Sequence, residues 1–164
     1  MSGAVEPYAR LAALGLVLPP AARPIGLYTP AVIAGGFLYL SGQGPREADG
    51  RMHTGKVGRD VGTEVAAAYA RLVALNLLSA AHEALGDLRR VVRVVKLLGM
   101  VNAVPDFADH VAVINGASAL LLEVFGEQGR HARSAVGMGS LPGNITVEIE
   151  AIFQVGPLPT EPAE

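Results

Sequence analysis

The sequence that decides the fold reads HARSAV at residues 131–136, LPGN at 141–144 and ITVEIEAIF at 145–153. It places Arg133 just before a short extended segment, which a Pro-Gly-Asn turn joins to a clear strand pattern. Every odd position from 145 to 155 is apolar, whereas Glu148 and Glu150 share the opposite face. A guanidinium and a carboxylate brought together by such a turn can hold a small anion and position a water molecule beside it.

A long helix is predicted over about residues 61–85, upstream of this stretch. Asp60 can cap its first turn, and Gly86 can end it. Helical spacing predicts one apolar stripe, made of Val61, Val65, Tyr69, Leu72, Ala80 and Ala84.

A strand and a second long helix follow. The β-branched run from Val91 to Val101 is typical of a central strand. Pro105-Asp106 predicts the start of a helix over about residues 107–124, and Gly126 predicts its end.

The N-terminal part predicts a short helix and a hairpin. Residues 6–14 have a helical pattern, and the proline-rich run at 18–24 breaks regular structure. Residues 31–33 and 37–41 predict two strands joined at Gly35-Gly36. We therefore divide the chain into an N-terminal helical extension (1–23), one domain (24–156) and a flexible tail rich in proline and glutamate (157–164).

This order of elements predicts an α+β sandwich, with one sheet and both long helices on one face. The other sheet face then carries Glu148 and Glu150 among apolar neighbours, which fits packing against another subunit. The hydrophobic content of 51% fits such a buried interface. A GC-rich composition favouring Ala, Gly and Val explains it equally well.

Composition excludes several classes of protein. The chain has no cysteine, so disulfides, thiol nucleophiles and thiolate metal sites are excluded. A formal net charge of −2 argues against a dedicated nucleic-acid binder. No apolar run approaches the roughly 18 residues of a membrane span, and the N-terminus does not resemble a signal peptide. We expect a cytoplasmic protein.

Three common types of site are disfavoured by the sequence. Gly50 to Lys56 matches most of a phosphate-binding P-loop, but Val57 occupies the Ser/Thr position and no strand precedes the loop. His53, His82, His110 and His131 show no paired spacing for a metal. No Ser-His-Asp signature or nucleophile elbow is present.

Taken alone, Arg133 and Glu148 leave two interpretations open. In the first, Arg133 is a solvated surface charge and Glu148 lies on the solvent-exposed face of an edge strand. In the second, both residues belong to one functional site. Spacing does not decide between these, since exposed ion pairs contribute little and are common.

Four segments, in order, resemble the RidA (YjgF) family of imine/enamine deaminases. Arg133-Ser134, Leu141-Pro142 and residues 147–151 resemble its C-terminal signature. The three further matches are Gly26-Leu27-Tyr28, Leu40-Ser41-Gly42-Gln43 and Ile114-Asn115-Gly116. The resemblance covers about residues 24–155, and the N-terminal helix is similar to that of a longer-chain branch.

The resemblance implies a chorismate-mutase-like fold with a mixed β-sheet. It also implies a homotrimer in which three sheets form an inner barrel, with an active site in each cleft between subunits. Such an assembly would account for the sheet face that lacks a covering layer.

The resemblance implies hydrolysis of 2-imino or 2-enamino acids, such as 2-iminobutanoate and 2-iminopropanoate, to 2-keto acids and ammonia. Arg133 would hold the substrate carboxylate, and Glu148 would activate the attacking water. Tyr28, Ser41 and Asn115 would line the pocket and bind substrate or water. An imine is already electrophilic, so the reaction needs no metal or cofactor.

Four positions depart from the family pattern. His131 replaces a common proline, Ala135 a common cysteine and Leu27 a frequent proline, and the run at 137–139 is unusually rich in glycine. These changes bear on the substrate side chain more than on the basic reaction.

Two other functions remain as alternatives. One is a trimer that binds a small carboxylate, such as a 2-keto acid, without turnover. The other is a ribonuclease or translation-inhibitor activity, which the acidic charge and the missing basic stripe disfavour.

Overall fold

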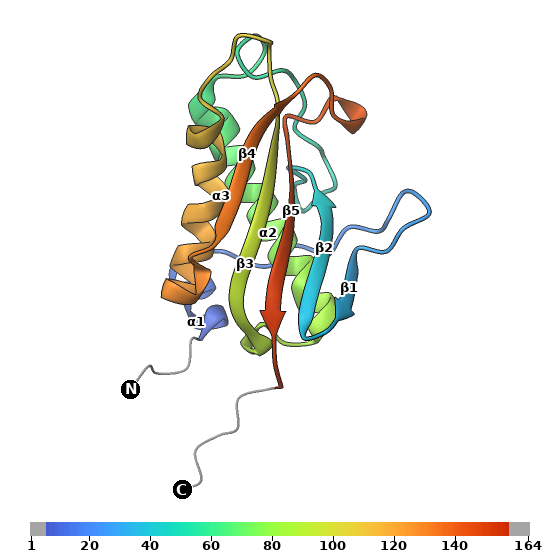
Figure 1. The fold of residues 1–164 in the computed structure, drawn as a ribbon, viewed down its shortest axis with the longest axis vertical. Helices are drawn as coiled ribbons and strands as arrows, with labels where there is room; N and C mark the ends of the chain where they lie inside the picture. The colour runs from blue at the N-terminus through green and yellow to red at the C-terminus, as the bar shows by residue number, and fades with distance from the viewer. Residues whose placement is uncertain (1–5, 158–164) are drawn as a thin grey trace, which may run out of the picture.

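The computed structural model describes residues 6–157, which form one mixed five-stranded sheet with helices on one face (Figure 1). The strands are β1 (Ala31–Ala34), β2 (Phe37–Gln43), β3 (Val91–Asn102), β4 (Ala132–Met138) and β5 (Val147–Val155). Their order is β1-β2-β5-β3-β4, with β3 and β4 parallel and the other pairs antiparallel. The predicted α+β fold and mixed sheet are confirmed.

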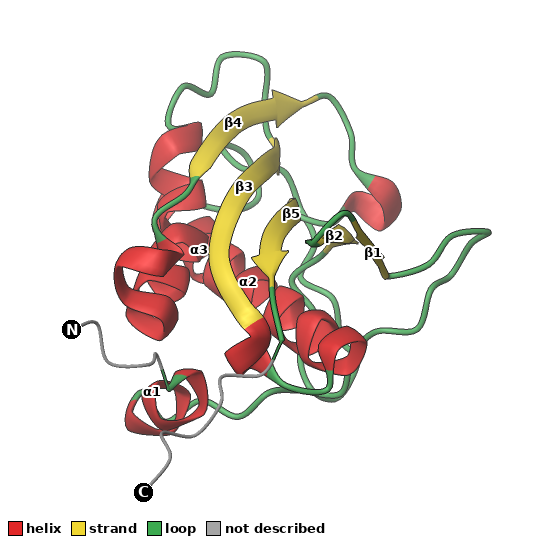
Figure 2. Cartoon of the chain, turned by 60° about the horizontal axis from the view of Figure 1, so that its bottom comes forward, coloured by secondary structure: helices red, strands yellow, loops and turns green. Residues whose placement is uncertain are grey.

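Helices α2 (Thr63–Leu85) and α3 (His110–Phe125) pack on each other and cover the same face of the sheet (Figure 2). The short helix α1 (Pro7–Ala13) packs against α3 near the chain ends. The opposite sheet face has no covering layer among residues 6–157. Of the predicted tail, residues 158–164 lie outside the described part of the chain.

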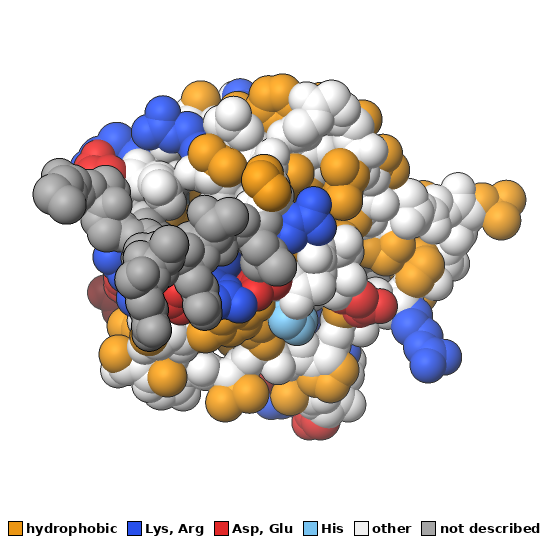
Figure 3. All heavy atoms as spheres, turned by 90° about the horizontal axis from the view of Figure 1, so that it is seen from below, with side chains coloured by type: hydrophobic (Ala, Val, Ile, Leu, Met, Phe, Trp, Pro, Cys, Tyr) orange, Lys and Arg blue, Asp and Glu red, His pale blue; other side chains and the backbone are white. Residues whose placement is uncertain are grey.

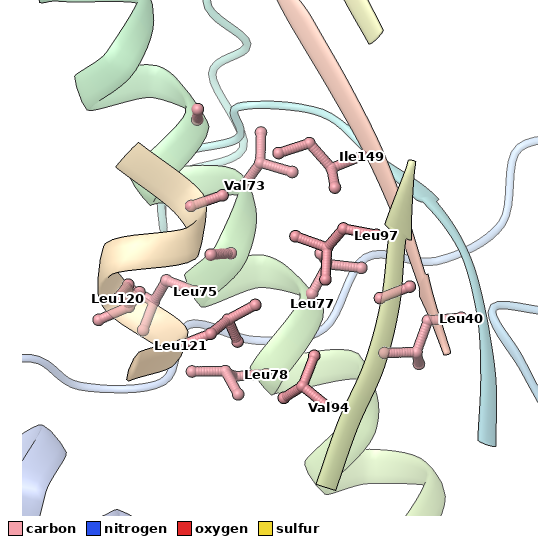
Figure 4. Close-up of a cluster of buried hydrophobic side chains, with 14 of the residues drawn as sticks. Leu40, Val73, Leu75, Leu77, Leu78, Val94, Leu97, Leu120, Leu121 and Ile149 are labelled. Atoms are coloured by element: carbon pink, nitrogen blue, oxygen red, sulfur yellow. The ribbon is translucent and has the colours of Figure 1, made fainter. Parts of the chain in front are cut away.

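The core lies between the sheet and the two long helices (Figure 4). Leu97 of β3 and Ile149 of β5 point from the sheet toward α2. Leu120 and Leu121 of α3 belong to the same buried cluster. The odd positions of β5 from 147 to 153 are buried and the even positions are more exposed, so the predicted alternation is confirmed.

The predicted cap of α2 and most of its predicted stripe are wrong. Of the stripe only Ala80 is buried, and Val65 is 48% exposed. The buried apolar residues of the helix are Ala66, Ala70, Val73, Ala74, Leu75, Leu77, Leu78, Ala80, Ala81 and Leu85. Because α2 contacts both the sheet and α3, its buried face is wider than a single stripe. Asp60 does not cap the helix: its carboxylate accepts from the Lys56 amide and from Arg59, and the N-cap is Gly62.

The second helix begins at His110, three residues later than predicted. Pro105 and Asp106 form a turn in which the Phe107 amide donates to the Val104 carbonyl at 3.1 Å. Proline therefore opens a turn here and not the helix itself. Gly126 ends the helix, as predicted.

The N-terminal helix is anchored by Tyr8. Its hydroxyl oxygen accepts from the Leu88 amide at 2.8 Å and lies 2.8 Å from His82 Nδ1. Leu11 from the same helix is buried. These contacts fix α1 against the domain.

Contrary to the expectation from sequence, α2 is long and apolar enough by length and composition to cross a membrane. Just over half of its most apolar stretch is buried inside the domain, as expected for a core helix.

Figure 3 shows the lower end of the molecule, where hydrophobic, acidic and basic side chains are interspersed.

Candidate active site

The five residues that the sequence nominated fall into two groups on opposite faces of the sheet. Tyr28, Ser41 and Glu148 line one cleft of about 760 Å³. Arg133 and Asn115 contact each other on the helix side of edge strand β4. We call these the glutamate side and the arginine side.

Glu148 projects from β5 on the sheet face that lacks helices. It is half-buried, and no hydrogen bond to its carboxylate is found among residues 6–157. Burial, with a smaller effect from the negative charge of Glu150, raises the pKa of the Glu148 carboxyl above its ordinary value. A carboxylate with a raised pKa is better suited to accept a proton near neutral pH.

Gly42 explains how the Glu148 carboxylate reaches the cleft. The carboxylate folds over the backbone of β2, and a Cβ at position 42 would collide with its Oε1 atom. The missing side chain of Gly42, the glycine of the Ser-Gly-Gln motif, therefore leaves the space that the Glu148 carboxylate occupies.

Ser41 has only part of its hydrogen-bonding capacity free. Its hydroxyl donates to the Thr29 carbonyl at 2.7 Å, and its amide donates to the Pro30 carbonyl at 2.9 Å. These bonds hold the segment that carries Tyr28 against the end of β2. The Ser41 oxygen can still accept a hydrogen bond from a ligand or a water molecule.

Arg133 lies within β4, not before it as the sequence suggested. It pairs in register with buried Leu97 of β3 and therefore faces α3. Its Nη1 donates to Ser118 Oγ at 2.8 Å, and its Nη2 donates to Asn115 Oδ1 at 2.8 Å and to the Val111 carbonyl at 3.4 Å. No carboxylate of the described chain lies within ion-pairing distance of Arg133. Burial lowers its pKa, but a guanidinium stays charged.

Two residues of the arginine side were not nominated from the sequence. Ser118 joins Arg133 to His131, whose Nε2 lies 2.9 Å from Ser118 Oγ and whose Nδ1 lies 2.6 Å from the Gly129 carbonyl oxygen. Ser118 follows Asn115 by three residues on α3, so helical spacing places both on one face. That spacing could have found Ser118, whereas His131 stood out only as a departure from the family pattern.

A single protomer does not bring Arg133 and Glu148 together. Strand β3 separates β4 from β5, so their axes lie about 10 Å apart. Glu148 pairs with Met100, whose partner on β4 is Val136, and this adds about 10 Å along the strand from Arg133. Since the two side chains also point to opposite faces, a site that contains both needs a second copy of the chain.

The loop that resembles a P-loop has a structural role. Lys56 Nζ donates to Asn102 Oδ1 at 2.9 Å, to the Ala103 carbonyl at 3.3 Å and to the Gly139 carbonyl at 2.7 Å. All three ammonium protons therefore have protein acceptors. Within residues 6–157, no three His, Cys, Asp or Glu side chains are placed to hold a metal ion.

Comparison with known proteins identifies the family. The profile described as "YjgF/chorismate mutase-like, putative endoribonuclease" matches residues 8–152. Protein TCP17 of Trypanosoma cruzi is 45% identical over 148 residues, which is 90% of this chain and 92% of that protein. A RutC family protein of Pyrococcus horikoshii is 32% identical, over 80% of this chain and 90% of its own length.

Solved structures agree with this result. A protein of unknown function from Agrobacterium tumefaciens is 49% identical, with a TM-score of 0.84 over 92% of each chain. RidA from an Antarctic Psychrobacter is 27% identical, with a TM-score of 0.56 over 84% of this chain and 94% of that one. The chain belongs to the YjgF/RidA-like family.

Proposed function

We propose that this protein hydrolyses 2-imino and 2-enamino acids to 2-keto acids and ammonia, at sites formed between the copies of a homotrimer. The observation that carries the proposal is Arg133, a charged guanidinium held by three hydrogen bonds, with no carboxylate of residues 6–157 in ion-pairing distance. An oriented, unpaired guanidinium is suited to bind the carboxylate of a small 2-imino acid.

Exposed apolar side chains support the assembly. The segment before β1 projects from the sheet edge as a loop (Figures 1 and 2), and on it Ile25 and Leu27 are almost fully exposed. Tyr39 and Val136 lie exposed on the uncovered sheet face. Apolar surface of this kind is typical of a face that another protein chain covers.

The proposed chemistry divides between the two sides. Arg133 from one copy holds the substrate carboxylate, while Glu148 from the next accepts a proton from water as its oxygen bonds to the imine carbon. Transfer of this proton to the nitrogen gives a carbinolamine. Glu148 then moves the hydroxyl proton to the nitrogen, the carbon–nitrogen bond breaks as the C=O bond forms, and ammonia leaves with the 2-keto acid. Ser41 accepts a hydrogen bond from the water or from the imine N–H.

Ammonia release tests the proposal directly. An amino-acid oxidase or a threonine dehydratase generates the imine in place, and release is followed with wild type, Arg133→Ala and Glu148→Gln. Arg59→Ala, on an exposed ion pair with Asp60, is the matched control. We expect activity in wild type and control, and losses of at least about 30-fold in the other two. Equal rates for wild type and Arg133→Ala would contradict the proposal.

The same variants separate the second candidate, a trimer that binds 2-keto acids without turnover. Asn115 and Ser118 hold Arg133 before any ligand is bound, and this arrangement serves binding alone as well as catalysis. Binding of a 2-keto acid that Arg133→Ala abolishes, without ammonia release by wild type, would favour this candidate. A ribonuclease, suggested by the family description, would instead bind RNA in a salt-dependent way and release shortened RNA products.

A further inference from the structure

A chain of hydrogen bonds runs from Arg133 through Ser118 and His131 to the backbone of Gly129. We infer that Ser118 and His131 are positioning residues, which orient the Arg133 guanidinium toward the substrate carboxylate. The inference rests on the proposed function for its substrate, and on the distances of 2.8, 2.9 and 2.6 Å along the chain for its geometry.

The acceptor at one end of this chain, the Gly129 carbonyl, and the donor at the other, Arg133, fix the direction of every bond. The Gly129 carbonyl can only accept, so His131 Nδ1 donates to it. In the neutral imidazole Nε2 is then an acceptor, and the Ser118 hydroxyl donates to it. The lone pairs of Ser118 Oγ are thereby turned toward Nη1 of Arg133. Burial, with a smaller effect of the nearby Arg133 charge, lowers the pKa of His131 and favours this neutral form.

The far end of the chain is rigidly placed. Gly129 is buried in the short 3₁₀ helix η2 (Gly126–Gly129), which packs on α3 so closely that a Cβ at position 129 would collide with the Leu121 carbonyl. Ser118 lies on the same helix, α3. His131 therefore links two parts of one rigid unit, and its ring has little freedom to turn.

The result is a guanidinium oriented before substrate arrives. Both Nη atoms of Arg133 are engaged, by Ser118 on one side and by Asn115 and Val111 on the other. The Nε proton and one Nη1 proton have no acceptor among residues 6–157 and are available to a ligand. Fixing these donors in advance reduces the entropy that binding would otherwise cost.

A matched pair of substitutions separates this role from simple loop anchoring. His131→Gln places an amide about where Nε2 lies and can still accept from Ser118, whereas His131→Asn reaches only the Nδ1 position and can still donate to Gly129. If His131 positions Arg133, Gln keeps affinity for a 2-keto acid and Asn loses about tenfold. The reverse order would mean that His131 only anchors the loop, and it would overturn the inference.

Ser118 provides the second test. Ser118→Ala is expected to raise KM for the imine about tenfold with kcat changed less than twofold, and Ser118→Thr, which keeps the hydroxyl, is expected to restore KM. An unchanged KM in Ser118→Ala, in a protein whose wild type is active, would contradict the inference and leave the proposed function intact.

A spectroscopic measurement does not depend on activity. In ¹⁵N-arginine-labelled protein, hindered rotation should give separate Nη signals for Arg133 in wild type, which merge in Ser118→Ala. Signals already averaged in wild type would overturn the inference whatever the activity assay shows. If wild type neither releases ammonia nor binds 2-keto acids but shows the separate signals, the proposed function fails while the positioning of Arg133 stands.

Discussion

The arginine side and the glutamate side differ in how far one chain completes them. Arg133 is oriented by three hydrogen bonds that it donates to α3. The carboxylate of Glu148, by contrast, has no hydrogen-bond partner within residues 6–157 and lies in a cleft beside an exposed loop. Under the proposed function, one chain supplies an anion-binding group on one face and a base on the other, so that the proposed reaction requires a second copy.

The largest expected effect comes from breaking the scaffold of the arginine side. A Cβ at Gly116 would collide with the Ala67 carbonyl where α3 crosses α2, and neither backbone can move away cheaply. We expect Gly116→Ala to lower the free energy of unfolding by about 3 kcal/mol, measured by urea denaturation. Gly139→Ala, with no atom within 4 Å of the added Cβ, is the control and should change it little.

The glutamate side can be broken without unfolding the protein. In Gly42→Ala the added methyl group meets the flexible end of Glu148, so the carboxylate moves and the backbone need not. We expect kcat to fall about 100-fold, as for loss of a general base, while 2-keto acid affinity and stability stay near wild type. Gly62→Ala, which adds a methyl group in open space, is the matched control. If the affinity for the 2-keto acid fell by the same factor as kcat, Glu148 would contribute to ligand binding and not act only as the base.

The raised pKa of Glu148 predicts the pH dependence of the reaction. Only the ionised carboxylate accepts a proton, so kcat should fall as the pH is lowered. Because the pKa of Glu148 is raised, this fall should occur at higher pH than the titration of an ordinary glutamic acid. A pH–rate profile of wild type measures this limb. A limb within the ordinary range would contradict the assignment of Glu148 as the base.

The same shift has a consequence for stability. A carboxyl whose pKa is raised on folding binds its proton more tightly in the folded state. The free energy of unfolding therefore decreases as the pH rises from the ordinary pKa of glutamate through the raised pKa of the folded protein. Glu148→Gln removes this cost. It should be more stable than wild type at neutral pH, and the difference should vanish below the ordinary pKa of glutamate. Glu83→Gln on the exposed side of α2 serves as control.

The smallest expected effect concerns neither side of the site. Tyr8→Phe leaves the Leu88 amide without its acceptor and removes the contact with His82. We expect a loss of about 1 kcal/mol in the free energy of unfolding and unchanged kcat and KM. A change in KM would connect α1 to the site.

Sequence patterns predicted which residues are buried where an element is buried on one face only, and failed where two neighbours bury an element on a wider surface. The alternation of β5 was confirmed because one face of that strand is buried and the other is not. The stripe of α2 was wrong because the helix is buried by both the sheet and α3, which a single apolar stripe does not describe.

The site shows the same limit. The family resemblance named Arg133 and Glu148, but the face on which each lies depends on strand register, which the sequence does not display. Ser118 could have been found from its spacing to Asn115, once α3 was accepted as a helix. His131 could not, since its role depends on a contact with the backbone of η2.

Mixed trimers test the central claim, that each site takes Arg133 from one copy and Glu148 from another. Arg133→Ala and Glu148→Gln are purified separately, shown to be inactive, and then assembled together by refolding or by co-expression with two affinity tags. With random mixing, about a quarter of all sites pair an intact Arg133 with an intact Glu148, and in mixed trimers selected by both tags about a third do. We therefore predict recovery of about a quarter and about a third of wild-type kcat, respectively. Mixed trimers that form but stay as inactive as the parents would contradict the shared site.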